Sequence, residues 1–96
     1  MLEYRLNKRA LVDLDKIAEY SYENFGLQRG DAYSESLFAA FRGLVEFPEK
    51  GTSINHIKRN TRRLMYESHV IYYRVSKNRI TIMRILHQNQ DPLRHL

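Results

Sequence analysis

The stretch HVIYYRVSKNRITIMRILHQNQD, residues 69 to 91, predicts the centre of the fold. It contains two β-rich runs, 69 to 75 and 80 to 87, and the short connection from Ser76 to Arg79 between them is typical of a β-hairpin. Apolar residues stand at both parities of each run, so the predicted strands have two apolar faces. Both faces therefore need a cover, and the pattern leaves open which parity points to the main core.

The sequence before this hairpin predicts a strand and two helices. Residues 3 to 7 alternate in the manner of a strand, and Asn7 can cap the helix that follows. Apolar residues then recur at three- and four-residue steps until Gly26, which is a suitable helix stop. A second helix is expected over residues 28 to 47, because Pro48 forces the residue before it out of helical geometry.

A loop is expected from residue 48 to residue 60, and a further strand from 62 to 67. The order β-α-α-β-β-β then indicates an α+β fold of two layers, in which a helical hairpin packs on one face of a small, mostly antiparallel sheet. We expect residues 1–96 to form one domain around one modest core. The helical hairpin can cover only one face of the sheet, so the other face is either closed by the loop and the C-terminal tail or left for a partner.

Composition and charge limit the function classes. The chain has no cysteine, no His, Asp or Glu spacing typical of a metal site, and no apolar run near the roughly 20 residues of a membrane helix. We therefore expect a cytoplasmic protein with no metal, no other cofactor, no membrane contact and no small-molecule ligand. Residues 1 to 49 contain six Lys and Arg against nine Asp and Glu, net −3, whereas residues 50 to 96 contain ten against two, net +8. The basic half should attract an anionic partner, either nucleic acid or an acidic protein segment.

Three segments of the chain carry a family pattern. They are ALVDLDKIAEYSYENFG (residues 10 to 26), the second helix from Ala32 through Pro48 to Gly51, and the strand pair YESHVIYYRV (66 to 75) with ITIMRILHQNQD (80 to 91). Together they resemble the ParE branch of the RelE/ParE superfamily of bacterial toxins, over the whole length of the chain. Gln90 departs from the pattern, because many ParE-like sequences have Met before the Asp.

This resemblance implies a toxin of a type II toxin–antitoxin system. Such a toxin poisons DNA gyrase, traps cleaved DNA and stops replication, and it is held inactive in a hetero-oligomer with a cognate ParD-like antitoxin. RelE-type relatives of the same fold instead cut messenger RNA in the ribosome, which makes an mRNA interferase the first alternative. A non-toxic binding relative that acts only in an autoregulatory complex is the second.

Arg84 and His87 are the candidates for ribonuclease chemistry, since in-line attack by a 2′-hydroxyl needs proton exchange and a cation. The last strand lacks the cluster of lysines and arginines that RelE-type toxins carry. We therefore predict no catalytic residue and interpret His87 as a strand-ending residue that hydrogen-bonds the tail or neighbouring backbone. A charge within an apolar strand needs a partner, and we expect Arg84 to pair with Glu67 or Asp91 rather than to face a bound anion.

Contact with the target is assigned to four residues: Arg62, Arg63, Arg84 and His87. Two of them belong to the densest basic run, KRNTRR (58 to 63), for which a solvated loop and strand edge is the alternative. Two further polar residues receive structural interpretations. Asp13 is expected to favour the dipole at the N-terminal turn of the first helix, and His69 to hydrogen-bond a turn.

Contact with the antitoxin is assigned to apolar residues beside the inward faces of the helices and on one strand: Leu11, Tyr22, Phe38, Val45 and Tyr72. If the helical residues among them are exposed, they form the rim of a groove that can receive an amphipathic antitoxin helix. The alternative is a wide core that buries them.

Overall fold

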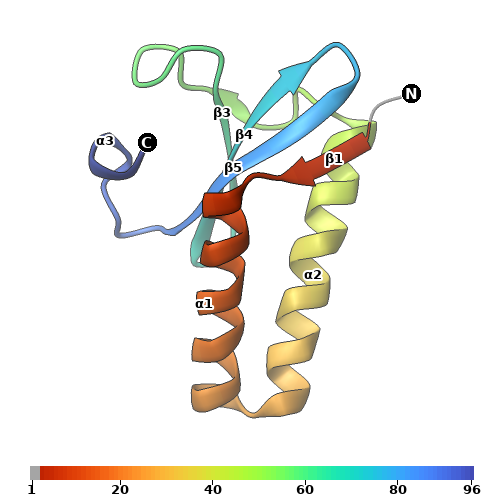
Figure 1. Ribbon diagram of the computed structural model, residues 1–96, viewed down its shortest axis with the longest axis vertical. Helices are drawn as coiled ribbons and strands as arrows, with labels where there is room; N and C mark the ends of the chain where they lie inside the picture. Colours follow the sequence, from red (N-terminus) through yellow and green to blue (C-terminus); the bar gives the residue numbers. More distant parts are fainter. Residues whose placement is uncertain (1–2) are drawn as a thin grey trace.

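The predicted hairpin is the centre of a five-stranded sheet in the computed structural model, which describes residues 3–96 (Figure 1). The strands are β1 Glu3–Leu6, β2 Thr52–Ser53, β3 Arg62–Tyr66, β4 His69–Ser76 and β5 Arg79–His87. They stand in the order β1-β5-β4-β3-β2. β1 is parallel to β5 and all other neighbours are antiparallel, which confirms the mostly antiparallel sheet.

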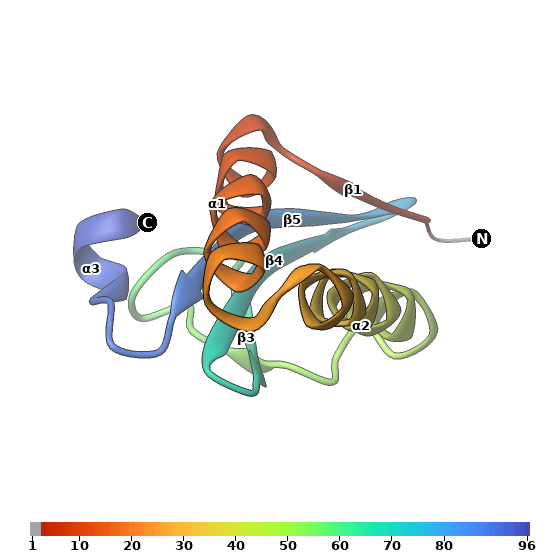
Figure 2. The ribbon, with the colours of Figure 1, turned by 90° about the horizontal axis from the view of Figure 1, so that it is seen from below.

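Two long helices, α1 Lys8–Phe25 and α2 Leu27–Glu46, form an antiparallel hairpin on one face of the sheet (Figure 2). Asn7 caps α1 as predicted, because its side chain accepts a hydrogen bond from the Ala10 backbone N–H at 2.9 Å. α1 ends at Phe25, and the next residue, Gly26, has a φ of 86°, a left-handed value that favours glycine. α2 begins directly after Gly26. The predicted α+β fold is confirmed. No helix in the described part of the chain combines the length and apolar character that a membrane crossing needs.

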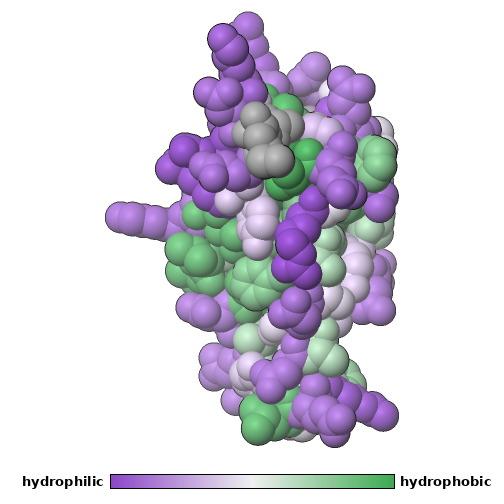
Figure 3. Space-filling view, turned by 90° about the vertical axis from the view of Figure 1, so that its right-hand side faces the viewer, coloured by the Kyte–Doolittle hydropathy of each residue, from purple (hydrophilic) through white to green (hydrophobic). Residues whose placement is uncertain are grey.

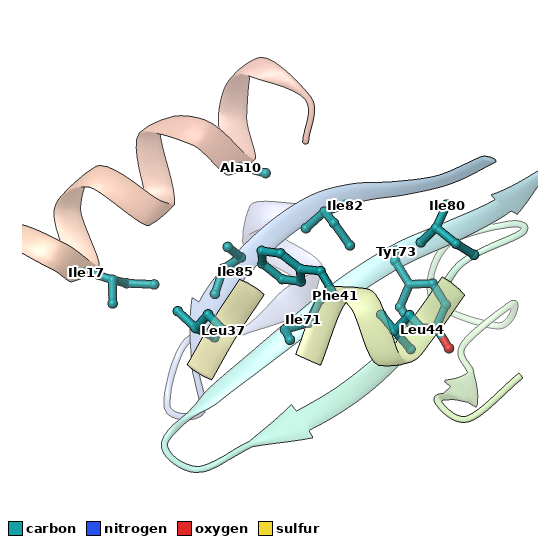
Figure 4. Close-up of a cluster of buried hydrophobic side chains, with 10 residues drawn as sticks. All are labelled: Ala10, Ile17, Leu37, Phe41, Leu44, Ile71, Tyr73, Ile80, Ile82 and Ile85. Atoms are coloured by element: carbon teal, nitrogen blue, oxygen red, sulfur yellow. The ribbon is translucent and has the colours of Figure 1, made fainter. Parts of the chain in front are cut away.

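The main core lies between the helical hairpin and the sheet (Figure 4). Its buried side chains come from both helices and the two central strands: Ala10, Ile17, Leu37, Phe41, Leu44, Ile71, Tyr73, Ile80, Ile82 and Ile85. Ile82 and Ile85 face the same layer although they are three residues apart on β5, because Met83 is an extra residue opposite the Tyr72–Tyr73 step of β4. This bulge decides the parity that the alternation left open.

The opposite face of the sheet carries a smaller apolar cluster. This outer cluster comprises Ile54, Val70, Tyr72 and Leu86, with Ile57 and Leu96 packed against it. The 54–61 loop and the C-terminal tail therefore close this face, which is one of the two predicted alternatives. The sequence interpretation missed two short elements there, β2 and the helix α3 Pro92–His95. Both are too short for a hydrophobic period to reveal them.

Candidate functional site

A buried ion pair joins α1 to β5. β1 ends at Leu6, which pairs with Ile82, and beyond this point the side chain of Asp13 takes the place of a neighbouring strand. Asp13 Oδ2 accepts hydrogen bonds from Arg84 Nε at 2.7 Å and from the Ile85 backbone N–H at 3.0 Å, while Oδ1 accepts from Arg84 Nη2 at 2.9 Å. Only 13% of the Arg84 side chain and 10% of the Asp13 side chain are exposed. The pair therefore completes an otherwise open sheet edge.

Arg84 also ties the C-terminal helix to this edge. Its Nη1 donates to the His95 carbonyl at 2.9 Å, and Arg9 Nη2 donates to the same oxygen at 2.9 Å. The hydrogen bond to Asp13 raises the pKa of Arg84, so this guanidinium stays charged. Because Nε, Nη1 and Nη2 all donate within the chain, Arg84 is a structural link between α1, β5 and α3.

A cleft of about 820 Å³ lies between the helical hairpin and the β3–β4 turn. Its lining combines aromatic, basic and hydrogen-bonding side chains: Lys16, Ile17, Tyr20, Ser21, Phe25, Arg29, Tyr33, Glu67, Ser68, His69 and His87. His69 and His87 stand opposite each other on β4 and β5, with their ring centres 5.8 Å apart. The Tyr33 hydroxyl and His69 Nδ1 share a hydrogen bond of 2.6 Å.

Burial keeps His69 and Tyr33 uncharged at neutral pH. It lowers the pKa of His69, and the facing His87 lowers it further. Burial also raises the pKa of Tyr33 to about 12, and the Glu67 carboxylate contributes in the same direction. This pair can hydrogen-bond a partner, but it supplies no positive charge to a phosphorane-like transition state.

His69 gives the folding free energy a pH dependence in the acidic range. Its pKa is lower in the folded chain, so as the pH falls below about 6.5 the unfolded chain binds more protons and the free energy of unfolding decreases. We expect His69→Gln to flatten this decrease between about pH 7 and pH 5 in urea denaturation series. His56→Gln, at an exposed loop position, is the control and should leave the curve unchanged. Equal slopes for wild type and His69→Gln would contradict the assignment.

Comparison with known proteins identifies the family of the chain. Residues 4–92 match the family model described as the ParE toxin of type II toxin-antitoxin system, parDE. The chain belongs to the ParE toxin family. It is 36% identical over 96 residues to Toxin ParE1 of Caulobacter vibrioides, covering 100% of this chain and 99% of that protein. It is 30% identical over 94 residues to Toxin ParE1 of Mycobacterium tuberculosis, covering 97% and 96% of the two chains.

A solved structure agrees with the ParE-family fold. The structure described as the chromosomal ParDE TA system from P. aeruginosa aligns with a TM-score of 0.78 at 20% sequence identity, covering 91% of this chain and 96% of that chain. At this identity the likeness concerns the fold alone. It confirms two helices packed on a mixed sheet.

In this ParE-family chain, Arg84 has an ion-pair partner as predicted, but both predicted partners are wrong. The partner is Asp13 rather than Glu67 or Asp91. The interpretation of Asp13 is wrong as well, because it lies in the second turn of α1 and points to the sheet edge instead of serving the first turn. Helical periodicity places a carboxylate on the solvent face by default, and the arginine that buries this one is 71 residues away in the sequence.

The two strand histidines have different outcomes. His87 has the predicted structural role, because its Nδ1 accepts a hydrogen bond from the Asn89 backbone N–H at 3.1 Å. His69 does not hydrogen-bond a turn as expected, but pairs with Tyr33 of α2. Only the packing of α2 against the start of β4 brings these two residues together.

The four residues assigned to target contact do not form one cluster in this ParE-family chain. Arg63 and Arg84 stand in register on either side of Tyr72, across β3, β4 and β5. Arg62 stands opposite Tyr73 of the main core, and its Nη1 donates to the Gly51 and Glu49 carbonyls. Target contact stays a prediction for all four, and Arg63 and His87 are the exposed members.

The residues assigned to antitoxin contact also separate into groups. Leu11 and Tyr22 are exposed, by 50% and 37%. Phe38 and Val45 pack against the main core, so the wide-core alternative describes them. Tyr72 is only 2% exposed within the outer cluster, which contradicts the idea that it lies on an open apolar face. Leu11 and Tyr22 remain the candidates that a partner can reach directly.

Several exposed apolar residues were missed by the sequence interpretation: Val12, Tyr20, Phe25 and Leu27. All four lie on α1 or at the start of α2. Figure 3 shows hydrophobic side chains at the lower end of the molecule, where the two helices meet. The sequence could have indicated two of them. The helical period of α1 places Val12 and Tyr20 outside the row of apolar residues that faces the core.

Proposed function

We propose that this chain is a toxin that inhibits DNA gyrase and blocks replication, and that a ParD-like antitoxin neutralises it in a hetero-oligomer. The family match over residues 4–92 supports the toxin role. The net charge of +8 on residues 50 to 96 supports an anionic target, for which a gyrase–DNA complex is suitable. The same charge favours an acidic antitoxin segment.

A non-enzymatic mode of action is supported above all by the Arg84–Asp13 pair. An interferase would need the strand arginine to approach the developing charge on the scissile phosphate. Here Asp13 accepts from both Nε and Nη2, and the third nitrogen donates to the His95 carbonyl. Using Arg84 in catalysis would therefore require breaking a buried pair. We infer that the chain acts by docking to its target.

The antitoxin is proposed to lie along α1. Leu11 and Tyr22 are 11 residues apart, about three helical turns, so both side chains point to one side of this helix. Both are exposed, and Phe25 lies near the same side at the end of the helix. An amphipathic helix with apolar residues at matching spacing would cover them.

Two assays run in parallel on the purified chain test the proposed function. We expect inhibition of gyrase supercoiling and no cleavage of ribosome-bound messenger RNA, and the opposite pair of results would reject it. In cells induced without antitoxin, DNA synthesis should stop before protein synthesis. Normal growth after induction would instead support a non-toxic binding relative.

His87→Ala separates the proposed function from the interferase alternative. We expect the variant to keep growth inhibition, weakened at most by the loss of one of the four predicted target contacts, because His87 accepts a backbone hydrogen bond at the end of β5 and no proton transfer is required of it. Growth rate after induction is the measurement, with antitoxin affinity and urea denaturation as controls for the fold. Loss of toxicity with both controls unchanged would point to ribonuclease action.

A further inference from the structure

A small polar hollow lies where the 54–61 loop meets the sheet. Its volume is about 120 Å³, and its lining includes Ser53, Asn55, Asn60, Thr61 and Arg62. A water molecule occupies about 30 Å³ of liquid, so the hollow can hold several waters or the oxygens of one phosphate group. The register of β3 and β4 pairs Arg62 with Tyr73, and the next two residues of β4 are Arg74, which lies outside the lining, and Val75, which is part of it.

Hydrogen bonding at this hollow, and at Arg74 beside it on β4, leaves donors without acceptors. Asn55 Oδ1 accepts from the Asn60 backbone N–H at 2.8 Å, so its NH₂ group is the part that remains to donate. Arg74 Nε is buried and has no hydrogen-bond partner among residues 3–96, and its Nη2 makes one long bond of 3.4 Å to the Arg59 carbonyl. A buried guanidinium N–H without an acceptor is costly. An acceptor from outside the chain would satisfy it.

The charges around the hollow are also unpaired. Within residues 3–96 the ion pairs are Arg42–Glu35 and Arg84–Asp13. The arginines near the hollow therefore have no carboxylate within ion-pair distance. Arg63 stands opposite Tyr72, and Arg74 lies two residues further along β4 on the same face, so the two are diagonal neighbours. Arg59 contacts Arg74 from the loop.

We propose that this loop-end surface, comprising Ser53, Asn55, Arg59, Asn60, Arg63 and Arg74, binds phosphate groups of the DNA backbone. The choice of DNA rests on the proposed function, because the gyrase complex contains DNA. Arginine, hydroxyl and amide donors are the groups that proteins use for phosphate contacts. Tyr72, the aromatic residue of the outer cluster, is buried and cannot stack on bases, so we expect binding to be independent of sequence.

An acidic protein segment fits this surface less well. Such segments combine carboxylates with several apolar anchors. Six of the nine exposed large apolar residues in the described part of the chain lie on the helical hairpin, and only one, Met65, lies on the outer face of β3 near Arg63. The loop-end surface offers donors and positive charge alone. Positive charge and hydrogen-bond donors are sufficient for binding to backbone phosphates.

Fluorescence anisotropy with a short duplex of mixed sequence tests the inference on the purified chain. We expect binding that weakens steeply between about 50 and 200 mM salt, because each phosphate contact releases counterions. Arg59→Gln combined with Arg74→Gln should weaken binding roughly tenfold and reduce the salt slope by about 2. The matched control is Lys16→Gln combined with Arg29→Gln, which removes the same charge from the hairpin cleft and should change affinity less than about twofold.

Three outcomes would overturn the inference: no duplex binding at low salt, equal weakening in the control variant, or displacement of the duplex by a poly-glutamate peptide more readily than by unlabelled DNA. If the variant with Arg74→Gln does not fold in urea denaturation, Arg59→Gln with Arg63→Gln replaces it, since both side chains are exposed. A supercoiling assay separates this inference from the proposed function. Gyrase inhibition without duplex binding would reject the DNA contact alone, and duplex binding without gyrase inhibition would reject the gyrase role alone.

Discussion

Replacing Asp13 with alanine is expected to lower the free energy of unfolding by about 3–5 kcal/mol. The change leaves the Arg84 guanidinium buried without its counter-charge and also removes the acceptor of the Ile85 backbone N–H. Both losses occur where only about a tenth of the Asp13 side chain is exposed. Urea denaturation of wild type and variant measures the difference.

Two further variants make the Asp13 result specific. Arg42→Ala breaks the surface pair with Glu35, whose side chains are 57% and 73% exposed, and should cost less than about 1 kcal/mol. Combining Asp13→Leu with Arg84→Met removes both charges, and it should recover much of the loss, because an uncompensated buried charge is the main cost of the single change. A single variant as stable as Arg42→Ala would show that the pair is not buried in solution.

Replacing Tyr73 with phenylalanine is expected to lower the free energy of unfolding. Each buried backbone group that loses its hydrogen-bond partner contributes about 1–3 kcal/mol to this decrease. The Tyr73 hydroxyl accepts from the Gly51 backbone N–H at 2.8 Å and donates to the Pro48 carbonyl at 2.8 Å. It therefore anchors the segment between α2 and β2 to the core. Faster hydrogen exchange of the Gly51 amide and a lower urea midpoint are the expected measurements.

The control for Tyr73 is Tyr20→Phe, at a position where 61% of the residue is exposed. This change should alter stability by less than about 0.5 kcal/mol. Unchanged exchange of the Gly51 amide in Tyr73→Phe would contradict the anchoring role. The two tyrosines thus distinguish a buried hydroxyl from an exposed one.

Local residue chemistry predicted much of the fold. The cap at Asn7, the stop at Gly26 and the two central strands depend on residues close together in the chain, and each was confirmed. The short elements β2 and α3 were not predicted, because each depends on contacts with distant parts of the chain. β2 exists through its pairing with β3, and α3 is held where Arg9 and Arg84 donate to the His95 carbonyl.

The candidate site was less predictable than the fold. Arg84 was correctly expected to need an ion-pair partner, because an isolated charge in an apolar strand is unfavourable. Sequence alone could not name the partner, and it assigned Asp13 to the N-terminal turn of its helix rather than to the sheet edge. The tyrosine–histidine pair in the cleft likewise depends on which strands and loops become neighbours, and so does the Arg74 Nε that has no hydrogen-bond partner among residues 3–96.

By itself the sequence determined the α+β class, the helical hairpin, the strand pair and the resemblance to ParE toxins, since these follow from short periods and contiguous motifs. Only the tertiary structure decided which face of β5 enters the core, through the bulge at Met83, and which polar side chains are buried. The physical reason is that burial and ion pairing depend on distance in space. The partners concerned are tens of residues apart along the chain.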